Sequence, residues 1–392
     1  MRICGIISEY NPFHLGHEEH IRKAREKTGA DIIICAMSGN FTQRGEPAIF
    51  DKWIRTRCAL LCGADAVIEL PLLTAVQSAE GFASGGVSVI DAAGADFLCF
   101  GSETDDKELL ESIAAGLSEE TAGFKKLLKE SLGSGDSFPK ARMKAAFPDA
   151  PEAACPNAIL GIEYIKAIKR SGSSLKPFAV KRVGGAYHSE EMDSPFPSAT
   201  AIRKAFREGK SSGAFGAMPA GCAQTIERAL SEGLRPVFPG VFDRELLYAI
   251  RRGGPGYLRT LHDVSEGLEN RIYKAAETAN GRDELIKAVK TKRYAYTRIS
   301  RVLLYALLGI TKEMVAEHNA RGTAFLRVLG VRGERVLSIL SRVSKAPLIC
   351  GSAASSGYPG TDIAASDIYA LSQDSPPFRN LKRDLTEKLI VV

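Results

Sequence analysis

Short apolar runs alternate with helical patterns through the first half of the chain, and this alternation constrains the fold more than any other feature. The runs are Ile3–Ser8, Asp31–Met37, Ala66–Leu70, Phe97–Phe100 and Pro177–Val183. Helical spacing fills the stretches between them, at Gly16–Thr28, Phe50–Cys62, Ser78–Ala93 and Ile159–Arg170. Because parallel strands need a crossover connection, usually a helix, this order predicts an α/β fold with a parallel sheet and helices on both faces.

The second half has a different pattern, in which strand signals fade and helical spacing dominates. The predicted helices are Glu245–Arg252, Glu266–Asn280, Arg282–Val289, Thr297–Leu308 and Lys312–Asn319. In the final section, Ala346–Cys350 and Ala365–Leu371 are expected to hold a short strand and closing helices. We therefore predict two domains: an α/β domain over 1–218 with a helical insertion at 105–150, and a mostly α-helical domain over 219–392.

Charge is distributed unevenly between the two halves. Residues 221–392 carry a net charge of +8 and residues 1–220 a net charge of −2, within a whole-chain charge of +6. A basic half of this kind favours a polyanionic partner, and nucleic acid is the first candidate.

Composition excludes several classes of protein. With 45% hydrophobic and 25% charged residues, the chain is neither disordered nor collagen-like. No apolar run reaches the roughly 18–20 residues of a membrane span, and the N-terminus lacks the apolar core of a signal peptide. The eight cysteines include no CxxC pair, so we expect reduced thiols and no metal site. These features predict a soluble, cytoplasmic protein that does not interact with a membrane.

An HxGH motif, formed by His14, Gly16 and His17, follows the first predicted strand and precedes a helix. A helix N-terminus at the carboxyl end of a parallel strand presents free N–H groups to an anion. Gly16 lets a phosphate approach the backbone closely. Two imidazoles there can donate hydrogen bonds to an α-phosphate on which charge develops. We therefore predict a phosphate site with His14 and His17 as catalytic donors.

A second phosphate-binding element is predicted after the last strand, at Pro197–Arg203. The hydroxyls of Ser198 and Thr200 can cap the helix that follows. The N-terminus of that helix would face the β- and γ-phosphates, and Arg203 would neutralise their charge. Such a capped helix is common by itself, and only its order after HxGH makes it specific.

These two elements resemble those of the HIGH-type nucleotidylyltransferase superfamily, which pairs HxGH with an SSTxIR element. Further segments narrow the resemblance to the tRNA(Met) cytidine acetate ligase family: Glu9–His14, Ser38–Ala48, Gly63–Pro71, Phe100–Glu103 and Pro156–Gly161. The similarity covers about residues 1–210 and continues more weakly through the helical half. It implies a Rossmann-like sheet of the HIGH type. Ala158 departs from the family pattern, in which a second Asn is expected.

The resemblance also implies an activity. Acetate would be activated with ATP to acetyl-adenylate, and the acetyl group would pass to N4 of the wobble cytidine of elongator tRNA(Met). Mg²⁺ would accompany ATP, held mainly by phosphates and water. The implied ATP contacts are Ile7, Ser8, Glu9, Tyr10, Asn11, Pro12, Phe13, His14, Leu15, Gly16, His17, Glu18, Glu19, His20, Gly101, Asn157 and Arg182. Ser198 and Thr200 join them from the second element.

The positions of three of these residues in the predicted elements also suggest contact with a ligand. Gly101 follows a strand at its carboxyl end, where ligands bind in open α/β sheets. Asn157 precedes a helix and can cap it or contact adenine, and Arg182 ends the last strand and can pair with phosphate. A turn glycine, a capping asparagine and a surface arginine are the alternative explanations.

Polar side chains at Ser38–Arg44 follow the second strand and can form an acetate pocket. Arg44 is the catalytic candidate among them, because its charge can neutralise a carboxylate or pyrophosphate. Lys52 and His188 are further candidates, for the carboxylate and for the triphosphate.

A basic segment without acidic residues runs from Lys287 to Lys312. Its cations can neutralise backbone phosphates, and its tyrosines can stack on unpaired bases. A solvated basic helix face is the ordinary explanation of such a run, but the charge of the whole half favours RNA. The predicted tRNA contacts are Lys287, Lys290, Lys292, Arg293, Tyr294, Tyr296, Arg298 and Arg301.

Two other functions remain open at the level of sequence. A small-molecule adenylyl- or cytidylyltransferase would use the same fold but would not need a basic helical half. A non-catalytic RNA-binding protein could retain a relic nucleotide pocket, although the intact HxGH motif and Arg203 argue against it. The sequence leaves the oligomeric state open.

Overall fold

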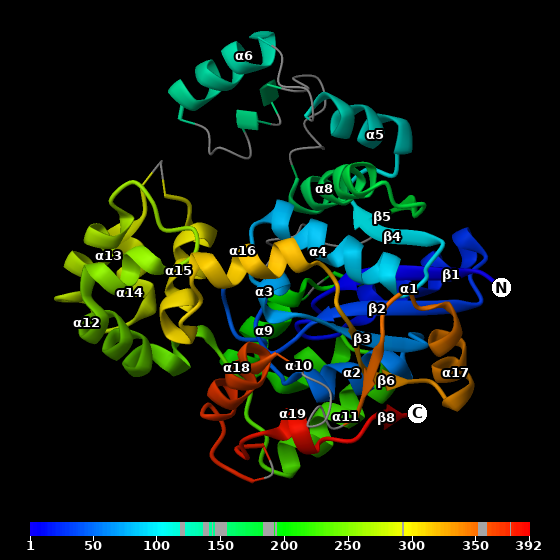
Figure 1. Ribbon diagram of the computed structural model, residues 1–392. Coiled ribbons are helices and arrows are strands. Elements are labelled where there is room, and N and C mark those ends of the chain that lie inside the picture. Colours follow the sequence, from blue (N-terminus) through cyan, green and yellow to red (C-terminus); the bar gives the residue numbers. More distant parts are fainter. Residues whose placement is uncertain are drawn as a thin grey trace.

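An eight-stranded sheet forms the centre of the protein (Figure 1). The structure is a computed structural model that describes residues 1–117, 122–135, 141–142, 144–145, 155–182, 192, 194–291, 294–351, 359–376 and 378–392. The strands are β1 (Ile3–Ser8), β2 (Ile32–Ser38), β3 (Ala66–Leu70), β4 (Phe97–Ser102), β5 (Lys176–Lys181), β6 (Leu326–Val331), β7 (Leu348–Cys350) and β8 (Ile390–Val391). Their order is β5-β4-β1-β2-β3-β6-β7, with β8 also paired to β6.

The predicted parallel sheet is confirmed for the first five strands. β1 lies at the centre, where Ile3 pairs with Ile32 of β2 and Cys4 pairs with Phe97 of β4. The strands β3 and β5 continue the parallel arrangement on the two sides. Because the chain winds in opposite directions from β1, a crevice opens outside the carboxyl ends of β1 and β4.

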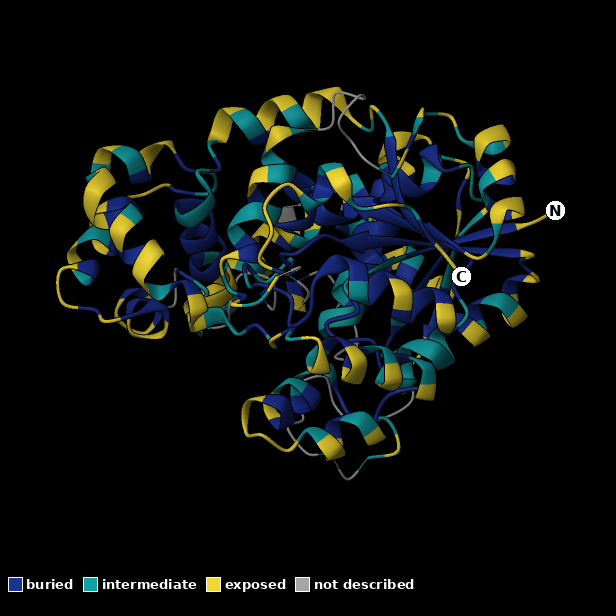
Figure 2. Ribbon diagram, turned by 90° about the horizontal axis from the view of Figure 1, so that it is seen from below, coloured by how far each residue is buried: buried dark blue, intermediate teal, exposed yellow. Residues whose placement is uncertain are grey.

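Helices cover both faces of the sheet, as the alternation of side chains along each strand requires. Ile32 and Ile34 of β2 share a core with α4 (Ala79–Ala92) and α8 (Pro156–Ser171). Ile33 and Cys35 point to the other face. They share a second core with α1 (Leu15–Thr28), α2 (Lys52–Leu61) and α11 (Ala220–Ser231). The sheet is accordingly buried on both sides (Figure 2).

The remaining described helices complete the molecule. They are α3 (Leu72–Ala75), α5 (Lys107–Gly116), α6 (Ala122–Gly133), α9 (Ala199–Arg207), α10 (Ser211–Gly216), the 3-10 helix η2 (Pro239–Phe242), α12 (Asp243–Thr260), α13 (Leu268–Ala276), α14 (Arg282–Val289), α15 (Tyr296–Leu308), α16 (Lys312–Arg321), α17 (Glu334–Val343), α18 (Gly360–Ala370) and α19 (Arg383–Thr386). The helices α12 to α15 form a helical group at one end of the sheet (Figure 1). Within the described residues, no helix combines the length and apolar character that crossing a bilayer requires.

Near the end of the chain, β7 and α18 lie where the short strand and a closing helix were expected, but one strand was missed. Leu326–Val331 is not among the predicted strands, yet it forms β6 and pairs antiparallel with β3, and β7 and β8 then pair with β6. The segment is short and contains the buried Arg327, and a charged residue weakens the hydrophobic pattern by which a buried strand is recognised. The domain boundary expected near Met218 therefore does not enclose the whole sheet, since β6, β7 and β8 come after it in the chain.

A buried ion cluster attaches this last part of the chain to the first half. Lys52 Nζ lies 2.7 Å from Glu69 Oε1 and 2.5 Å from Asp384 Oδ1. Arg327 Nη2 lies 3.3 Å from the same Asp384 oxygen. Lys52 is fully buried and does not line the cavity described below, so the expectation that it neutralises a substrate is corrected to a structural role.

Candidate active site

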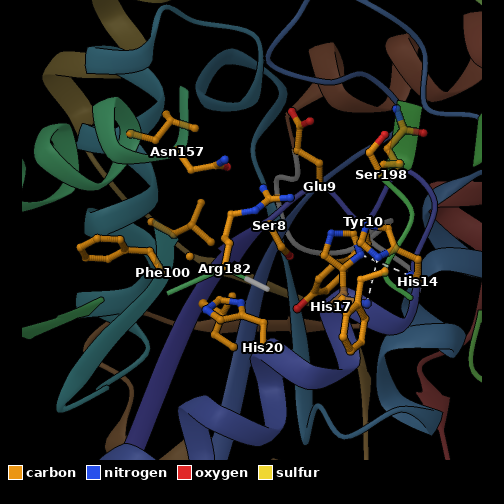
Figure 3. Close-up of a pocket in the computed structure, with 18 of the residues that line it drawn as sticks. Ser8, Glu9, Tyr10, His14, His17, His20, Phe100, Asn157, Arg182 and Ser198 are labelled. Atoms are coloured by element: carbon orange, nitrogen blue, oxygen red, sulfur yellow. Dashed lines mark hydrogen bonds between the residues drawn. The ribbon is translucent and has the colours of Figure 1, made fainter. Parts of the chain in front are cut away.

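A cavity of about 230 Å³ lies at the carboxyl ends of β1, β4 and β5 (Figure 3). Its walls come from the end of β1, the beginning of α1, the ends of β4 and β5, and the beginning of α9. The cations that line it are Lys23, Arg44, Lys181, Arg182 and Arg203, and the carboxylates are Glu9, Glu19 and Glu46. This is the crevice in which open α/β sheets bind their ligands, and its charge favours an anionic one.

The HxGH motif forms the beginning of α1. His14 is the N-cap residue, and its Nδ1 accepts a hydrogen bond from the backbone N–H of Gly16 at 3.1 Å. Nδ1 of His17 accepts one from the backbone N–H of His14 at 3.3 Å, which completes a reciprocal capping arrangement. Because each Nδ1 is an acceptor, the proton of each neutral ring lies on Nε2. Both histidines therefore carry an N–H for a ligand.

Burial keeps these rings uncharged. Desolvation lowers the pKa of His14 to about 3, with further lowering from the positive charges of Arg182 and Arg203. Desolvation also lowers the pKa of His17 well below its usual value, with added repulsion from His14 and Arg182. The same cause lowers the pKa of His20 to about 4. Near neutral pH the motif thus presents neutral N–H donors rather than imidazolium charge.

The glycine of the motif is required by a close approach. A Cβ placed on Gly16 would lie 2.9 Å from Cε1 of the His14 ring. The two imidazoles themselves stack with ring centroids 3.7 Å apart. Any side chain at Gly16 would push the His14 ring out of its capping position.

The second predicted element opens α9 on the same cavity. Ser198 is the N-cap, and its Oγ accepts from the backbone N–H of Ala201 at 3.0 Å. Nη1 of Arg203 donates to the backbone carbonyl of Asn11 at 2.7 Å, and Nη2 donates to Oγ1 of Thr200 at 3.3 Å. These bonds join the two elements that the sequence predicts to bind phosphate, so two capped helix N-termini border one cavity.

Gly101, Asn157 and Arg182 also line the cavity. Asn157 lies on the side away from His14 and His17 (Figure 3). Nδ2 of Asn157 donates to Oε1 of Glu103 at 2.7 Å, while Oε2 of Glu103 accepts from the backbone N–H of Ala158 at 2.9 Å. Glu103 therefore orients the asparagine side chain, a role that sequence reasoning missed. Arg182 lies between Asn157 and His17 in Figure 3, where its charge can meet a phosphate bound between them.

A turn after β2 brings Thr42, Arg44 and Glu46 to the cavity. The backbone N–H of Gln43 donates to Oε1 of Glu9 at 2.7 Å. Burial raises the pKa of Glu9 above its usual value, in part opposed by that hydrogen bond and by Arg44. Sequence reasoning identified Arg44 but missed Glu46, because a carboxylate beside an anion site has no distinctive local pattern.

Some predicted contacts lie elsewhere. Pro12, Phe13, Leu15 and Glu18 do not line the cavity, although they flank residues that do. Phe13 belongs to the core under α1, so it supports the motif from behind. Among the described residues, the cavity is also lined by residues that the sequence analysis did not propose for the site: Ile6, Lys23, Glu46, Phe100, Leu160, Tyr164, Val180, Lys181 and Phe196. Pro197 and Ala199 of the predicted second element line it as well. His188 lies outside the described residues.

The basic segment contains both exposed and buried residues. Lys287 and Lys290 are exposed, and Tyr296 is 40% exposed. Tyr294 is only 6% exposed, and its hydroxyl donates to the carbonyl of Glu266 at 2.8 Å. Its ring is therefore not at the surface, where the predicted base stacking would need it.

Two arginines of the segment form ion pairs with Asp263. Arg298 Nε lies 3.1 Å from Oδ1 of Asp263, and Nη2 of the buried Arg301 lies 3.6 Å from Oδ2. These arginines connect α15 to the loop between α12 and α13. Lys292 and Arg293 lie outside the described residues.

A parallel sheet, an HxGH helix start and a second capped helix at one cavity define a site of the nucleotidyltransferase class, and the family model described as HIGH Nucleotidyl Transferase matches residues 1–384. A tRNA(Met) cytidine acetate ligase of Acetivibrio thermocellus is 38% identical over 100% of both chains. That of Caldicellulosiruptor saccharolyticus is 43% identical over 88% of this chain and 86% of its own. The chain belongs to the tRNA(Met) cytidine acetate ligase family.

Solved structures agree with this relationship. The apo crystal structure of Thermotoga maritima TmcAL superposes with a TM-score of 0.92 at 33% identity, over the full length of both chains. The crystal structure of the same protein bound with alpha-thio ATP has a TM-score of 0.90 at 34% identity, again over both full lengths.

Proposed function

We propose that this protein is an ATP-dependent ligase that converts acetate to acetyl-adenylate and then acetylates N4 of the wobble cytidine of elongator tRNA(Met). The observation that carries the proposal is the pair of uncharged Nε2–H donors on His14 and His17, held by backbone hydrogen bonds at one cavity with the capped start of α9. The relatives' names supply the acetate and the tRNA. Since we propose a tRNA substrate, we also propose that the reaction takes place in the cytoplasm.

In the first step, an acetate oxygen attacks the α-phosphorus of ATP and the bond to the pyrophosphate oxygen breaks. Negative charge grows on the α-phosphoryl oxygens and on the leaving pyrophosphate. The Nε2–H groups of His14 and His17 donate to the first, while Arg203 and the start of α9 stabilise the second. Arg44 and Arg182 add positive charge around the phosphates. No protein nucleophile is needed, because positioning and charge stabilisation carry the step.

In the second step, the N4 amine of cytidine attacks the acyl carbon, the bond to the adenylate oxygen breaks, and AMP leaves while the amine loses a proton. This requires the anticodon loop to reach the same cavity. We assign ATP binding to the α/β portion within 1–218, and tRNA binding to the helical group and its exposed Lys287 and Lys290 within 219–392. The basic charge of the second half supports this division.

Mg²⁺ would enter with the nucleotide. Within the described ranges, no cluster of three or more His, Cys, Asp or Glu side chains could hold a metal by itself. The residues present fit an ion bound chiefly by phosphate oxygens and water, which is how Mg²⁺ commonly binds with nucleotides. It would neutralise phosphate charge beside the arginines.

The test is a pair of assays on the wild-type protein. Acetate-dependent exchange of labelled pyrophosphate into ATP reports the first step, and transfer of labelled acetate to tRNA(Met) reports the second. We expect both to occur, and transfer to require a cytidine at the wobble position. Exchange without transfer would favour a small-molecule transferase, and neither activity together with RNA binding would favour a non-catalytic RNA-binding protein.

A further inference from the structure

A tight turn, residues 42–46, lies between the cavity and the helical group. Gly45 N–H donates to the carbonyl of Thr42 at 2.9 Å, and Oγ1 of Thr42 donates to the carbonyl of Glu46 at 3.0 Å. Gly45 has a φ of 73°, and a Cβ there would lie 2.5 Å from the backbone nitrogen of Arg301. The turn therefore packs directly on the backbone of α15 while it also lines the cavity.

Side chains of α14 and α15 hold the acidic residue of this turn. Nη2 of Arg282 donates to Oε1 of Glu46 at 3.1 Å and to Oγ of Ser300 at 2.6 Å. Oγ of Ser300 donates in turn to the carbonyl of Arg44 at 2.5 Å. The hydroxyl of Tyr296 donates to Oε1 of Glu46 at 3.4 Å. Glu46 is thus fixed at a point where the cavity meets the helical group.

Two groups remain at this point for a ligand. The side chain of Glu46 is 18% exposed, and among the described residues no donor bonds to its Oε2. Tyr296 is 40% exposed, and the guanidinium of Arg282 lies over its ring with Cζ 5.8 Å from the centroid. A base would therefore stack on the opposite face of the ring, beside that carboxylate. A carboxylate oxygen next to an aromatic ring suits a planar base that stacks on the ring and donates an exocyclic amine.

We propose that Tyr296 and Glu46 form the binding subsite for the cytosine that receives the acetyl group. The base stacks on the Tyr296 ring and its N4 amine donates to Oε2 of Glu46. This inference rests on the proposed function, since it names the acceptor subsite of that reaction. Uracil presents a carbonyl oxygen in place of the amine, so the carboxylate repels it. The same subsite directs the amine toward the cavity, because Glu46 lines both.

The experiment measures binding of two RNA hairpins that copy the anticodon stem-loop of tRNA(Met), one with cytidine and one with uridine at the wobble position. Fluorescence anisotropy at fixed salt gives both affinities. We expect the wild type to prefer cytidine by about 5- to 100-fold, the discrimination of a good base contact. Glu46→Gln retains an oxygen for Arg282 but presents both a donor and an acceptor, so the preference should fall to about one. Glu317→Gln, an exposed residue of α16, is the matched control and should keep the preference.

The aromatic part is tested separately. Tyr296→Ala should weaken both hairpins by about 5- to 100-fold, whereas Tyr296→Phe, which keeps the ring, should retain most of the affinity. Thermal unfolding of each variant verifies that it is folded. A Glu46→Gln protein that still prefers cytidine as strongly as the wild type would overturn the subsite. If Glu46→Gln keeps the preference for cytidine while the wild type acetylates tRNA(Met), the proposed function stands and only the subsite fails. If the wild type prefers cytidine and Glu46→Gln does not, but the wild type fails to acetylate tRNA(Met), the subsite stands and the proposed function fails.

Discussion

At the scale of single residues, two imidazoles are set up as neutral donors by the backbone around them. The backbone N–H groups of Gly16 and His14 occupy the two Nδ1 atoms, which leaves Nε2–H for a ligand. A neutral N–H can donate throughout the pH range in which a free imidazole would change its charge. The motif thus gives a hydrogen-bond pattern that does not depend on pH near neutrality.

One variant tests this role directly. His17→Ala should reduce acetate-dependent pyrophosphate exchange by about 10²-fold or more, which is the scale for the loss of one donor to a charge that develops in the transition state. Its affinity for ATP should change much less. His262→Ala, a histidine outside the cavity, is the control. Exchange within a few-fold of the wild type would remove His17 from the mechanism.

The buried histidines also make a prediction about stability. The pKa of His14 is about 3 in the folded protein and about 6.5 in the unfolded chain, so only the unfolded state binds a proton between these values. The contribution of His14 to the free energy of unfolding is therefore fully present above about pH 6.5. As the pH falls below that value, this free energy decreases by about 1.4 kcal/mol for each pH unit. His14→Asn, which keeps a capping oxygen, should flatten the fall in unfolding free energy between pH 6.5 and 5 in urea titrations. An unchanged pH dependence would contradict the assignment of a neutral, buried His14.

At the scale of elements, one basic segment contributes both surface and core. Lys287 and Lys290 lie exposed on and just after α14. Arg301 on α15 is buried against Asp263, and Tyr294 is buried before α15 begins. Basic residues of this segment are therefore exposed at α14 and buried on α15.

This division predicts different outcomes along the segment. Lys287→Ala and Lys290→Ala should each weaken tRNA binding and lower the slope of log affinity against log salt by about one unit or less, because one phosphate contact releases about one counterion. Arg301→Ala should instead lower the stability of the protein, since it leaves Asp263 with one partner fewer. Affinities over a salt series, beside urea unfolding, distinguish the two effects. If both lysine variants keep the wild-type slope, the tRNA surface lies elsewhere.

At the scale of the whole molecule, the two ends of the chain build one sheet. β6 pairs with β3, and Asp384 enters the buried cluster around Lys52. The first 218 residues therefore lack β6, β7 and β8, the strands that continue their sheet beyond β3, and a counter-charge for a fully buried lysine. A fragment that ends near Met218 should be less stable than the whole chain for these reasons.

A single substitution tests this attachment. Asp384→Ala should lower the free energy of unfolding by about 3–5 kcal/mol, because Lys52 and Arg327 stay buried with less counter-charge. Asp374→Ala is the matched control: its partner Arg235 lies 2.9 Å away, both side chains are exposed, and such pairs contribute about 1 kcal/mol or less. Urea titration of both variants gives the comparison. Equal effects would show that the buried cluster does not hold the chain end in place.

The sequence by itself determined the parallel core and the two capped helix starts at the cavity, because both depend on residues that are neighbours in the chain. The βαβ alternation is a local periodicity, and His14, Gly16 and His17 lie within four positions. Local sequence also identified Ser198 as a helix cap. The predictions for Gly101, Asn157 and Arg182 depended on the family resemblance, and the structure places all three at the cavity.

Only the tertiary structure decided which charged and aromatic residues face solvent and which distant segments meet. Arg282 and Glu46 are 236 residues apart, and Lys52 and Asp384 are 332 apart, so no local pattern links them. Tyr294 and Tyr296 look alike in the sequence, yet one is buried and the other is exposed. Burial of a polar side chain depends on the partners that satisfy it, and those partners are brought together only when the sheet and the helical group pack.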